Sequence, residues 1–272
     1  MENILLIAAG FIIGSCGTLI GAGGGFILVP MLLIFYPELG TERITAISMA
    51  VVSLNAISGT AAYAKSGRID YKAGISFSAF TIPGSVLGAL LVKYIPRDAF
   101  SFVFGILLVV LAVYLFYKNS RPLKTHTAIT ATKGYATHTL TDKTGTTFTY
   151  SFSKIKGYAI SIVVGFISPL LGIGGGIIHV PAMVNWLRFP VHIATATSHF
   201  ILSVMATATV ITHLTEGTYN SPEIIKLIVL LAIGVVPGAQ LGAYFSGKLK
   251  SSVILQALSL CLIIVGIRIF IR

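Results

Sequence analysis

The feature that most constrains this chain is a glycine-rich break that occurs twice inside long apolar segments. Residues 21–30 read GAGGGFILVP and residues 172–181 read GIGGGIIHVP, and the surrounding segments, 3–36 and 157–187, contain no formal charge. A continuous helix of roughly 30 residues is about 50 Å long, too long for one crossing of a hydrocarbon core about 30 Å thick, and too short for two crossings with a turn. The sequence therefore predicts, in each segment, a helix, a break at membrane depth and a short re-entrant helix.

The composition indicates that these segments lie in a lipid bilayer. The chain is 55% apolar and 10% charged, with a mean hydropathy of +0.92, whereas soluble domains are about one quarter charged. All eight acidic residues fall at or beyond the ends of the apolar segments, which indicates an integral membrane protein in contact with the lipid bilayer. The net charge of +11 is scattered between these segments, so no nucleic-acid partner is expected. Both cysteines lie in apolar segments, and no metal site or cofactor is indicated.

Six further segments are close to the roughly 20 residues that a spanning helix requires. They are residues 44–64, 73–92, 100–117, 193–212, 224–245 and 253–271. Lys65, Arg68 and Lys72 follow the first of them, and further lysines occupy the central linker, which favours a cytoplasmic location for both loops. Lys93 and Arg97, on the expected outer side, are exceptions to this rule.

Three blocks recur in the same order in the two halves. GTLIGAGGGFILVPMLL (17–33) matches SPLLGIGGGIIHVPAMV (168–184), TAISMAVVSL (45–54) matches TATSHFILSV (195–204), and IPGSVLGALL (82–91) matches VPGAQLGAYF (236–245). The nearly constant offset indicates an internal duplication. These paired blocks resemble the TauE/SafE family of sulfite exporters over both halves, excluding the linker. The resemblance implies the export of sulfite or a small organosulfonate.

The whole pattern predicts an all-α membrane protein of two inverted-topology repeats, each a glycine-broken re-entrant helical hairpin plus three transmembrane helices. The repeats cover residues 1–118 and 157–272. They are expected in the cytoplasmic (inner) membrane with both termini outside, and an exposed helix face is compatible with a homodimer. Residues 119–156 form a cytoplasmic, Thr-rich linker, in which ATHTLTDKTGTTFTYSF alternates around a turn at residues 142–145. This alternation favours a small β-hairpin, and a disordered connector is the alternative.

The glycines suggest how an anion is held. A helix that starts at the midplane exposes backbone N–H groups and the positive end of its dipole, and glycine lets an oxyanion approach them. The predicted anion-binding glycines are Gly21, Gly23, Gly24, Gly25, Gly172, Gly174, Gly175 and Gly176. Pro30 and Pro181 are expected in the first turn of the short helices. The alternative is that the glycines serve only close helix packing.

Polar side chains on the helix after each break are the second set of candidates. Ser48 and Asn55 lie in the first half, and Thr195, Thr197, Ser198 and His199 lie in the second. Their hydroxyl, amide and imidazole groups can donate to the oxygens of a small anionic substrate, although Ser and Thr in membrane helices also bond the backbone. His179 and His199 are candidates for a proton-linked role, and the alternative is a neutral, hydrogen-bonded histidine.

Several functions compete with a sulfur-anion exporter. The membrane potential favours anion exit by about 2.3 kcal/mol per charge per 100 mV, so export needs no coupled ion. An anion channel also uses re-entrant helices, and an importer of thiosulfate or sulfate is a further alternative. No catalytic motif such as HExxH or GxSxG occurs, so the sequence does not indicate an enzyme.

Overall fold

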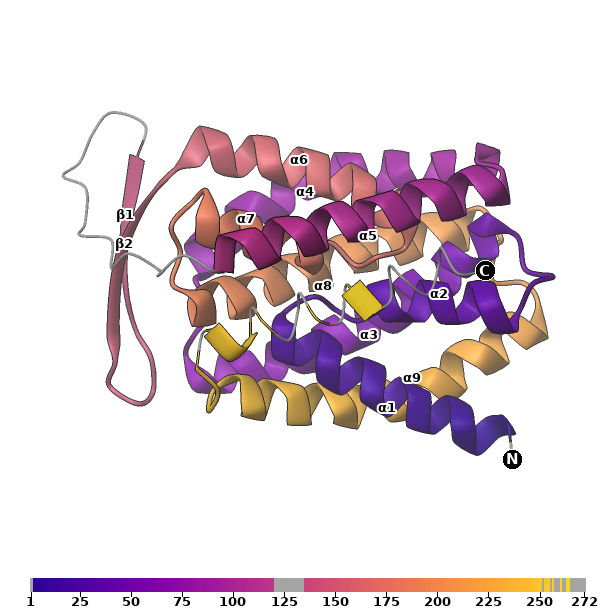
Figure 1. The fold of residues 1–272 in the computed structure, drawn as a ribbon, viewed down its shortest axis with the longest axis horizontal. Coiled ribbons are helices and arrows are strands. Elements are labelled where there is room, and N and C mark those ends of the chain that lie inside the picture. The colour runs from indigo at the N-terminus through magenta and orange to yellow at the C-terminus, as the bar shows by residue number, and fades with distance from the viewer. Residues whose placement is uncertain are drawn as a thin grey trace.

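The structure is a computed structural model that describes residues 2–119, 135–250, 252–254, 256, 260 and 263–264. Its elements in chain order are α1 (Glu2–Ile20), α2 (Gly25–Phe35), α3 (Thr41–Ser66), α4 (Tyr71–Leu91), η1 (Val92–Tyr94), α5 (Arg97–Asn119), β1 (Tyr135–Thr141), β2 (Thr147–Ser153), α6 (Lys154–Leu171), α7 (Gly176–Asn185), α8 (Val191–Thr215) and α9 (Pro222–Ser246). Figure 1 shows an elongated helical bundle with the two strands at one end, called here the hairpin end.

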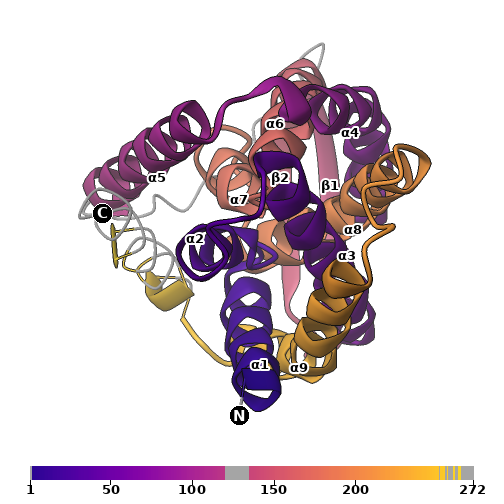
Figure 2. The same cartoon turned by 90° about the vertical axis from the view of Figure 1, so that its right-hand side faces the viewer.

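The expectation of an all-α membrane protein is confirmed. Within the described residues, seven helices are long and apolar enough to cross a membrane, namely α1, α3, α4, α5, α6, α8 and α9, whereas α2 and α7 are shorter. The expected span at residues 253–271 lies largely outside the described part of the chain. Among the spanning helices α3 and α8 are the most enclosed, with 67% and 72% of their apolar windows buried, and Figure 2 shows them side by side between α4 and α9.

Both glycine-rich segments break as predicted. The first apolar segment forms α1 and α2 and the second forms α6 and α7, separated at residues 21–24 and 172–175. The first pair opens at the end opposite the β-hairpin, and the second opens at the hairpin end (Figure 1). The short helices have 11 and 10 residues, so each break lies about 15 Å inside the bundle, near half the thickness of a hydrocarbon core. The opposite directions are those an inverted duplication would give, and the duplication itself stays a prediction.

Each of the longest contacts between helices joins a helix of the first half to a helix of the second half. Helix α1 packs along α9, α4 packs along α6, and α3 packs along α8. The PGxxLGA motifs of α4 and α9 provide the first two of these contacts, because a Cβ at Gly84 or Gly88 would overlap the α6 backbone, and a Cβ at Gly238 or Gly242 would overlap the α1 backbone. The small residues thus allow close helix packing.

The prediction for the two prolines is wrong. Helices α2 and α7 begin at Gly25 and Gly176, so Pro30 and Pro181 are each the sixth residue and lie in the second turn. The reason is that the glycines themselves terminate the break: Gly24 and Gly175 have positive φ, and the helical conformation starts at the next residue.

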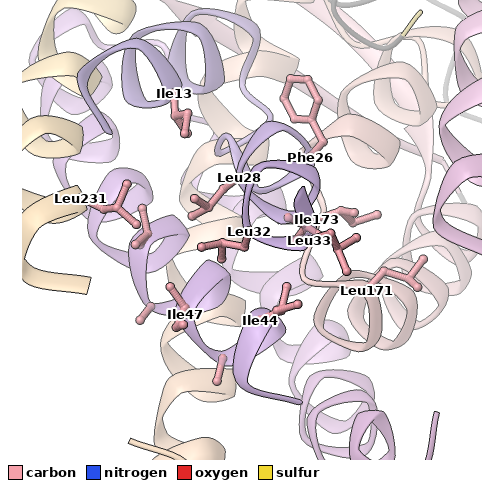
Figure 3. Close-up of a cluster of buried hydrophobic side chains, with 14 of the residues drawn as sticks. Ile13, Phe26, Leu28, Leu32, Leu33, Ile44, Ile47, Leu171, Ile173 and Leu231 are labelled. Carbon is pink, nitrogen blue, oxygen red and sulfur yellow. The ribbon is translucent and has the colours of Figure 1, made fainter. Parts of the chain in front are cut away.

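The apolar core is built around the first short helix. Figure 3 shows Phe26, Leu28 and Leu32 of α2 pointing into a cluster with side chains from both halves of the chain. Leu171 approaches from the end of α6, Ile173 from the second break and Leu231 from α9, and all these side chains are buried. Seven of the eleven residues of α2 are buried, and this packing holds α2, and with it the first break, in a fixed position.

The Thr-rich segment forms an antiparallel β-hairpin that pairs Tyr135 with Ser153 and Thr141 with Thr147. The hairpin is docked against the bundle through Asp70, the N-cap of α4, whose Oδ2 lies 2.5 Å from His138 Nδ1 and accepts a 2.6 Å hydrogen bond from Tyr150. Burial, together with the Asp70 carboxylate, raises the pKa of Tyr150 and keeps its hydroxyl a donor.

Lys93 and Arg97, the two exceptions to the charge rule, have partners at the end of the bundle opposite the β-hairpin. Lys93 pairs with Glu216 at 2.7 Å, and Arg97 donates to the carbonyl oxygens of Leu33 and Leu39 at 2.8 and 2.7 Å. Arg97 therefore stabilises the C-terminal end of α2, where unpaired carbonyls gather.

Candidate functional site

The two breaks have nearly the same backbone conformation. Gly21, Gly23 and Gly24 have φ of 78°, 81° and 85°, and the corresponding Gly172, Gly174 and Gly175 have φ of 67°, 77° and 49°. This left-handed region strains any residue with a Cβ. The short helices α2 and α7 follow directly, and neither has a side-chain cap on its first N–H groups.

The two breaks touch each other at the middle of the bundle. A Cβ on Gly25 would come within 2.8 Å of the Ile173 carbonyl carbon, and a Cβ on Gly176 would come within 2.6 Å of Ala22 Cα. Residues 21–25 and 172–176 are all buried. The structure therefore brings the eight predicted glycines together, and in this conformation the backbone of each break packs against the other.

Two equivalent serines hold the breaks reciprocally. Ser48 of α3 donates to the Gly172 carbonyl at 2.6 Å, and Ser198 of α8 lies 3.5 Å from the Gly21 carbonyl. These residues occupy matching positions of the repeated blocks, so each half supplies the serine that binds the break of the other half. Both hydroxyls lie where they could exchange a carbonyl for an anion oxygen.

A polar cluster lies on one side of the first break. Asn55 Nδ2 donates to the Gly23 carbonyl at 2.9 Å, and Asn55 Oδ1 accepts from Thr18 Oγ1 at 2.9 Å. Tyr63 donates to the Thr18 carbonyl at 2.6 Å. The second half has Met205 at the position of Asn55, and the Met205 side chain lies against the second break. The site is thus polar beside one break and more apolar beside the other.

His199 completes this cluster and retains an unused nitrogen. Its Nε2 lies 3.3 Å from Thr18 Oγ1, and the Thr18 proton is already donated to Asn55, so Nε2 is the donor of this contact. Nδ1 then carries a lone pair, and within the described residues it has no partner although the side chain is fully buried. A proton or a protonated oxyanion would satisfy it.

The remaining predicted residues lie in three different places. Thr195 is in contact with Gly21, and its hydroxyl donates to the Val191 carbonyl. Thr197 accepts from the Asp70 backbone N–H at 3.0 Å, toward the hairpin end. His179 lies between α6 and α7, with Nε2 3.4 Å from Ser161 Oγ.

Sequence reasoning missed three residues at the breaks, Thr18, Tyr63 and Ser168. Ser168 is fully buried, and its hydroxyl has no partner among the described residues although it lies beside Gly175. Thr18 and Ser168 precede the glycines within the repeated blocks, so the repeat alignment was the signal for both. Among the described residues, no cluster of three or more His, Cys, Asp or Glu side chains could hold a metal ion.

Comparison with known proteins identifies the family. The profile of the family described as "Sulfite exporter TauE/SafE" matches residues 6–269. The chain belongs to the TauE/SafE family. This family assignment confirms the expected resemblance and extends it across the Thr-rich linker. The protein is therefore a membrane transporter by family.

Its relatives in this family carry general names. "Probable membrane transporter protein YunE" of Bacillus subtilis is 34% identical over 278 residues, which cover 98% of this chain and 96% of the relative. "Probable membrane transporter protein MJ0441" of Methanocaldococcus jannaschii is 27% identical, with 97% and 93% covered. YdhB of Bacillus subtilis, named in the same way, is 25% identical, with 97% and 98% covered. No solved structure was found to match this chain.

Proposed function

We propose that this TauE/SafE protein exports a small sulfur-containing anion, sulfite or an organosulfonate, across the cytoplasmic membrane by alternating access. The observation that carries the proposal is the meeting of two uncapped helix N-termini at the middle of the bundle. Such ends present backbone donors and positive dipole ends to an anion without any cationic side chain.

Binding requires the two breaks to separate, because they are packed together in this conformation. Gly25 of one break lies against the Gly172 and Ile173 carbonyls, and Gly176 lies against the Gly21 carbonyl. An anion between them replaces these contacts with bonds to the N–H groups, while Ser48 and Ser198 turn from carbonyls to anion oxygens. Because the breaks come from different halves, movement of one half against the other opens the site to either side in turn.

The membrane potential supplies the driving force for export. With the linker in the cytoplasm and both termini outside, an interior-negative potential favours anion exit by about 2.3 kcal/mol per charge per 100 mV. His199 adds a proton-linked element, since its Nδ1, which has no partner among the described residues, accepts the proton of a hydrogen sulfite ion in the bound state.

The test is flux in proteoliposomes with an imposed potential. Sulfite efflux should be saturable, should follow a potassium diffusion potential and should be stimulated by sulfite on the far side. A strict requirement for a pH gradient at zero potential would defeat the potential-driven mechanism, and large single-channel currents would favour an anion channel.

A matched pair of glycine variants tests the site. Gly24 and Gly145 have nearly equal φ, 85° and 83°, but Gly24 lies in the first break, whereas a Cβ on Gly145 in the β-hairpin turn has nothing within 4 Å. Gly24→Ala should abolish sulfite flux and Gly145→Ala should retain it, with both proteins monodisperse in detergent. Undiminished flux in Gly24→Ala counts against the anion site.

A further inference from the structure

A second, positively charged pocket lies at the hairpin end of the bundle, away from the helix breaks. It has a volume of about 490 Å³ and lies between the end of α3, the end of α9 and the turn of the β-hairpin. Its cationic lining residues are Lys65, Arg68, Lys143 and Lys248. No lining residue is acidic, so the electrostatic potential in the pocket favours an anion.

The three lysines are available to a ligand. Lys65, Lys143 and Lys248 are exposed, and within the described residues none of them forms an ion pair with a carboxylate. Lys248 is held by Tyr244, with its ammonium 4.1 Å from the ring centroid. An ammonium group over an aromatic ring keeps its charge and most of its donors for another partner.

Arg68 forms the fixed wall of this pocket. Its Nε and Nη2 both lie 3.2 Å from Asp142 Oδ2, and its Nη1 lies against Gly247, where a Cβ would come within 2.7 Å. The other oxygen of Asp142 accepts from the backbone and hydroxyl of Thr144 and from the Thr146 N–H. Asp142 is therefore saturated and leaves the charge of the lysines uncompensated.

The aromatic side chains beside the pocket are of the kind found where a spanning helix meets the lipid headgroups. Tyr244 and Phe245, at the end of the spanning helix α9, are 56% and 43% exposed, and exposed aromatic rings at a helix end are typical of the membrane interface. Basic pockets between spanning helices at this depth suit lipid phosphate groups. The volume also exceeds what a sulfite ion fills, and no lining residue belongs to either break.

We propose that this pocket binds a phosphate-bearing anion, either the headgroup of an anionic phospholipid or a soluble phosphate. The bound group bridges Lys65 of α3, Lys248 of α9 and Lys143 of the β-hairpin, and so fastens the hairpin to the bundle. The proposal is independent of the transported anion.

The experiment compares two triple variants with equal loss of charge. K65Q/K143Q/K248Q removes the pocket lysines, and K154Q/K156Q/K226Q removes three exposed lysines outside it. Detergent-purified proteins are titrated with short-chain phosphatidylglycerol, short-chain phosphatidylcholine and inorganic phosphate, and the thermal midpoint is followed. Sulfite is titrated in parallel as a separate readout of the transport site.

Phosphatidylglycerol, inorganic phosphate or both should stabilise the wild type and the control variant, and phosphatidylcholine should not. The apparent Kd of the pocket variant should rise about 100-fold, since each of the three lysines near a phosphate contributes about fivefold. Stabilisation by the lipid alone identifies a headgroup site, and stabilisation by phosphate alone identifies a soluble ligand. Equal affinity in the two triple variants, or no stabilisation of the wild type by either anion, overturns the proposal whatever sulfite does.

Discussion

The contact between the two breaks makes a specific prediction for Gly25. Gly25→Ala places a methyl group 2.8 Å from the Ile173 carbonyl carbon and 2.9 Å from its oxygen, below the 3.4 Å at which ordinary contacts begin. All three nearest atoms are backbone of the opposite break, so no side chain can rotate away. The methyl group must push the two breaks apart.

The change in the free energy of unfolding caused by Gly25→Ala is the sum of two opposing effects. Overpacking in a rigid core costs about 1–3 kcal/mol, and replacing glycine with alanine in a helix returns up to about 1 kcal/mol. The net loss of about 1–2 kcal/mol should lower the thermal midpoint in detergent by roughly 2–8 °C. Gly40→Ala is the control, because a Cβ there has nothing within 4 Å, and its midpoint should stay within about 1 °C of wild type. Equal midpoints for the two variants would refute the reasoning, since the breaks would then not be packed together.

Four further predictions concern the polar contacts. Ser48→Ala should lower the thermal midpoint more than Ser198→Ala, because the hydrogen bond from Ser48 to the Gly172 carbonyl is 2.6 Å long and that from Ser198 to the Gly21 carbonyl is 3.5 Å long. The loss of a buried hydrogen bond costs about 1 kcal/mol. A larger loss of stability in Ser198→Ala than in Ser48→Ala would contradict the reciprocal arrangement. His199→Gln should flatten the pH dependence of sulfite flux and His179→Gln should preserve it, because the His199 side chain contacts Thr18 in the polar cluster at the first break, whereas the His179 side chain contacts Ser161 of α6. Identical pH profiles would exclude a special role for His199. Arg68→Gln should loosen the β-hairpin, because the ion pair between Arg68 and Asp142 connects the hairpin turn to the bundle. Limited proteolysis should then show trypsin cleavage at Lys143 that is faster by at least about threefold. Lys156→Gln is the control. Burial opposes ionisation of Asp142, but hydrogen bonds from Thr144, Thr146 and Arg68 outweigh it and hold the pKa of that carboxyl below its ordinary value. The ion pair with Arg68 therefore stabilises the hairpin above the ordinary pKa of the carboxyl, and this stabilisation is lost only as the pH falls through the lower pKa of the folded state. With a protease active over the range, cleavage at Lys143 should not change between about pH 5 and 8.

Much of the fold could be predicted because its signals are local. The length of an apolar segment limits how often it crosses a bilayer, and four glycines in five residues interrupt a helix wherever they occur. The expected spans therefore agree with the described helices to within about three residues at their ends. The Thr-rich hairpin was likewise indicated by alternation around Asp142 and Gly145.

The candidate site could be predicted less fully. The glycines and Ser48, Asn55, Ser198 and His199 do lie around the breaks, but the partner of each side chain depends on how the two halves pack. The sequence spacing of Ser48 and Gly172, 124 residues apart, contains no sign of their hydrogen bond. The sequence likewise gives no sign that Arg68 contacts Gly247, or that the Ser168 hydroxyl has no partner within the described part of the chain.

The sequence by itself determined that the chain spans a membrane, that it breaks two helices inside long apolar segments and that it belongs to one transporter family. These features depend on hydrophobicity, segment length and backbone freedom, which each short segment carries without its neighbours. Only the tertiary structure decided that the two breaks touch, that each is held by a serine of the other half and that the β-hairpin completes a basic pocket. Those features depend on atoms far apart in the chain, and packing alone brings such atoms within bonding distance.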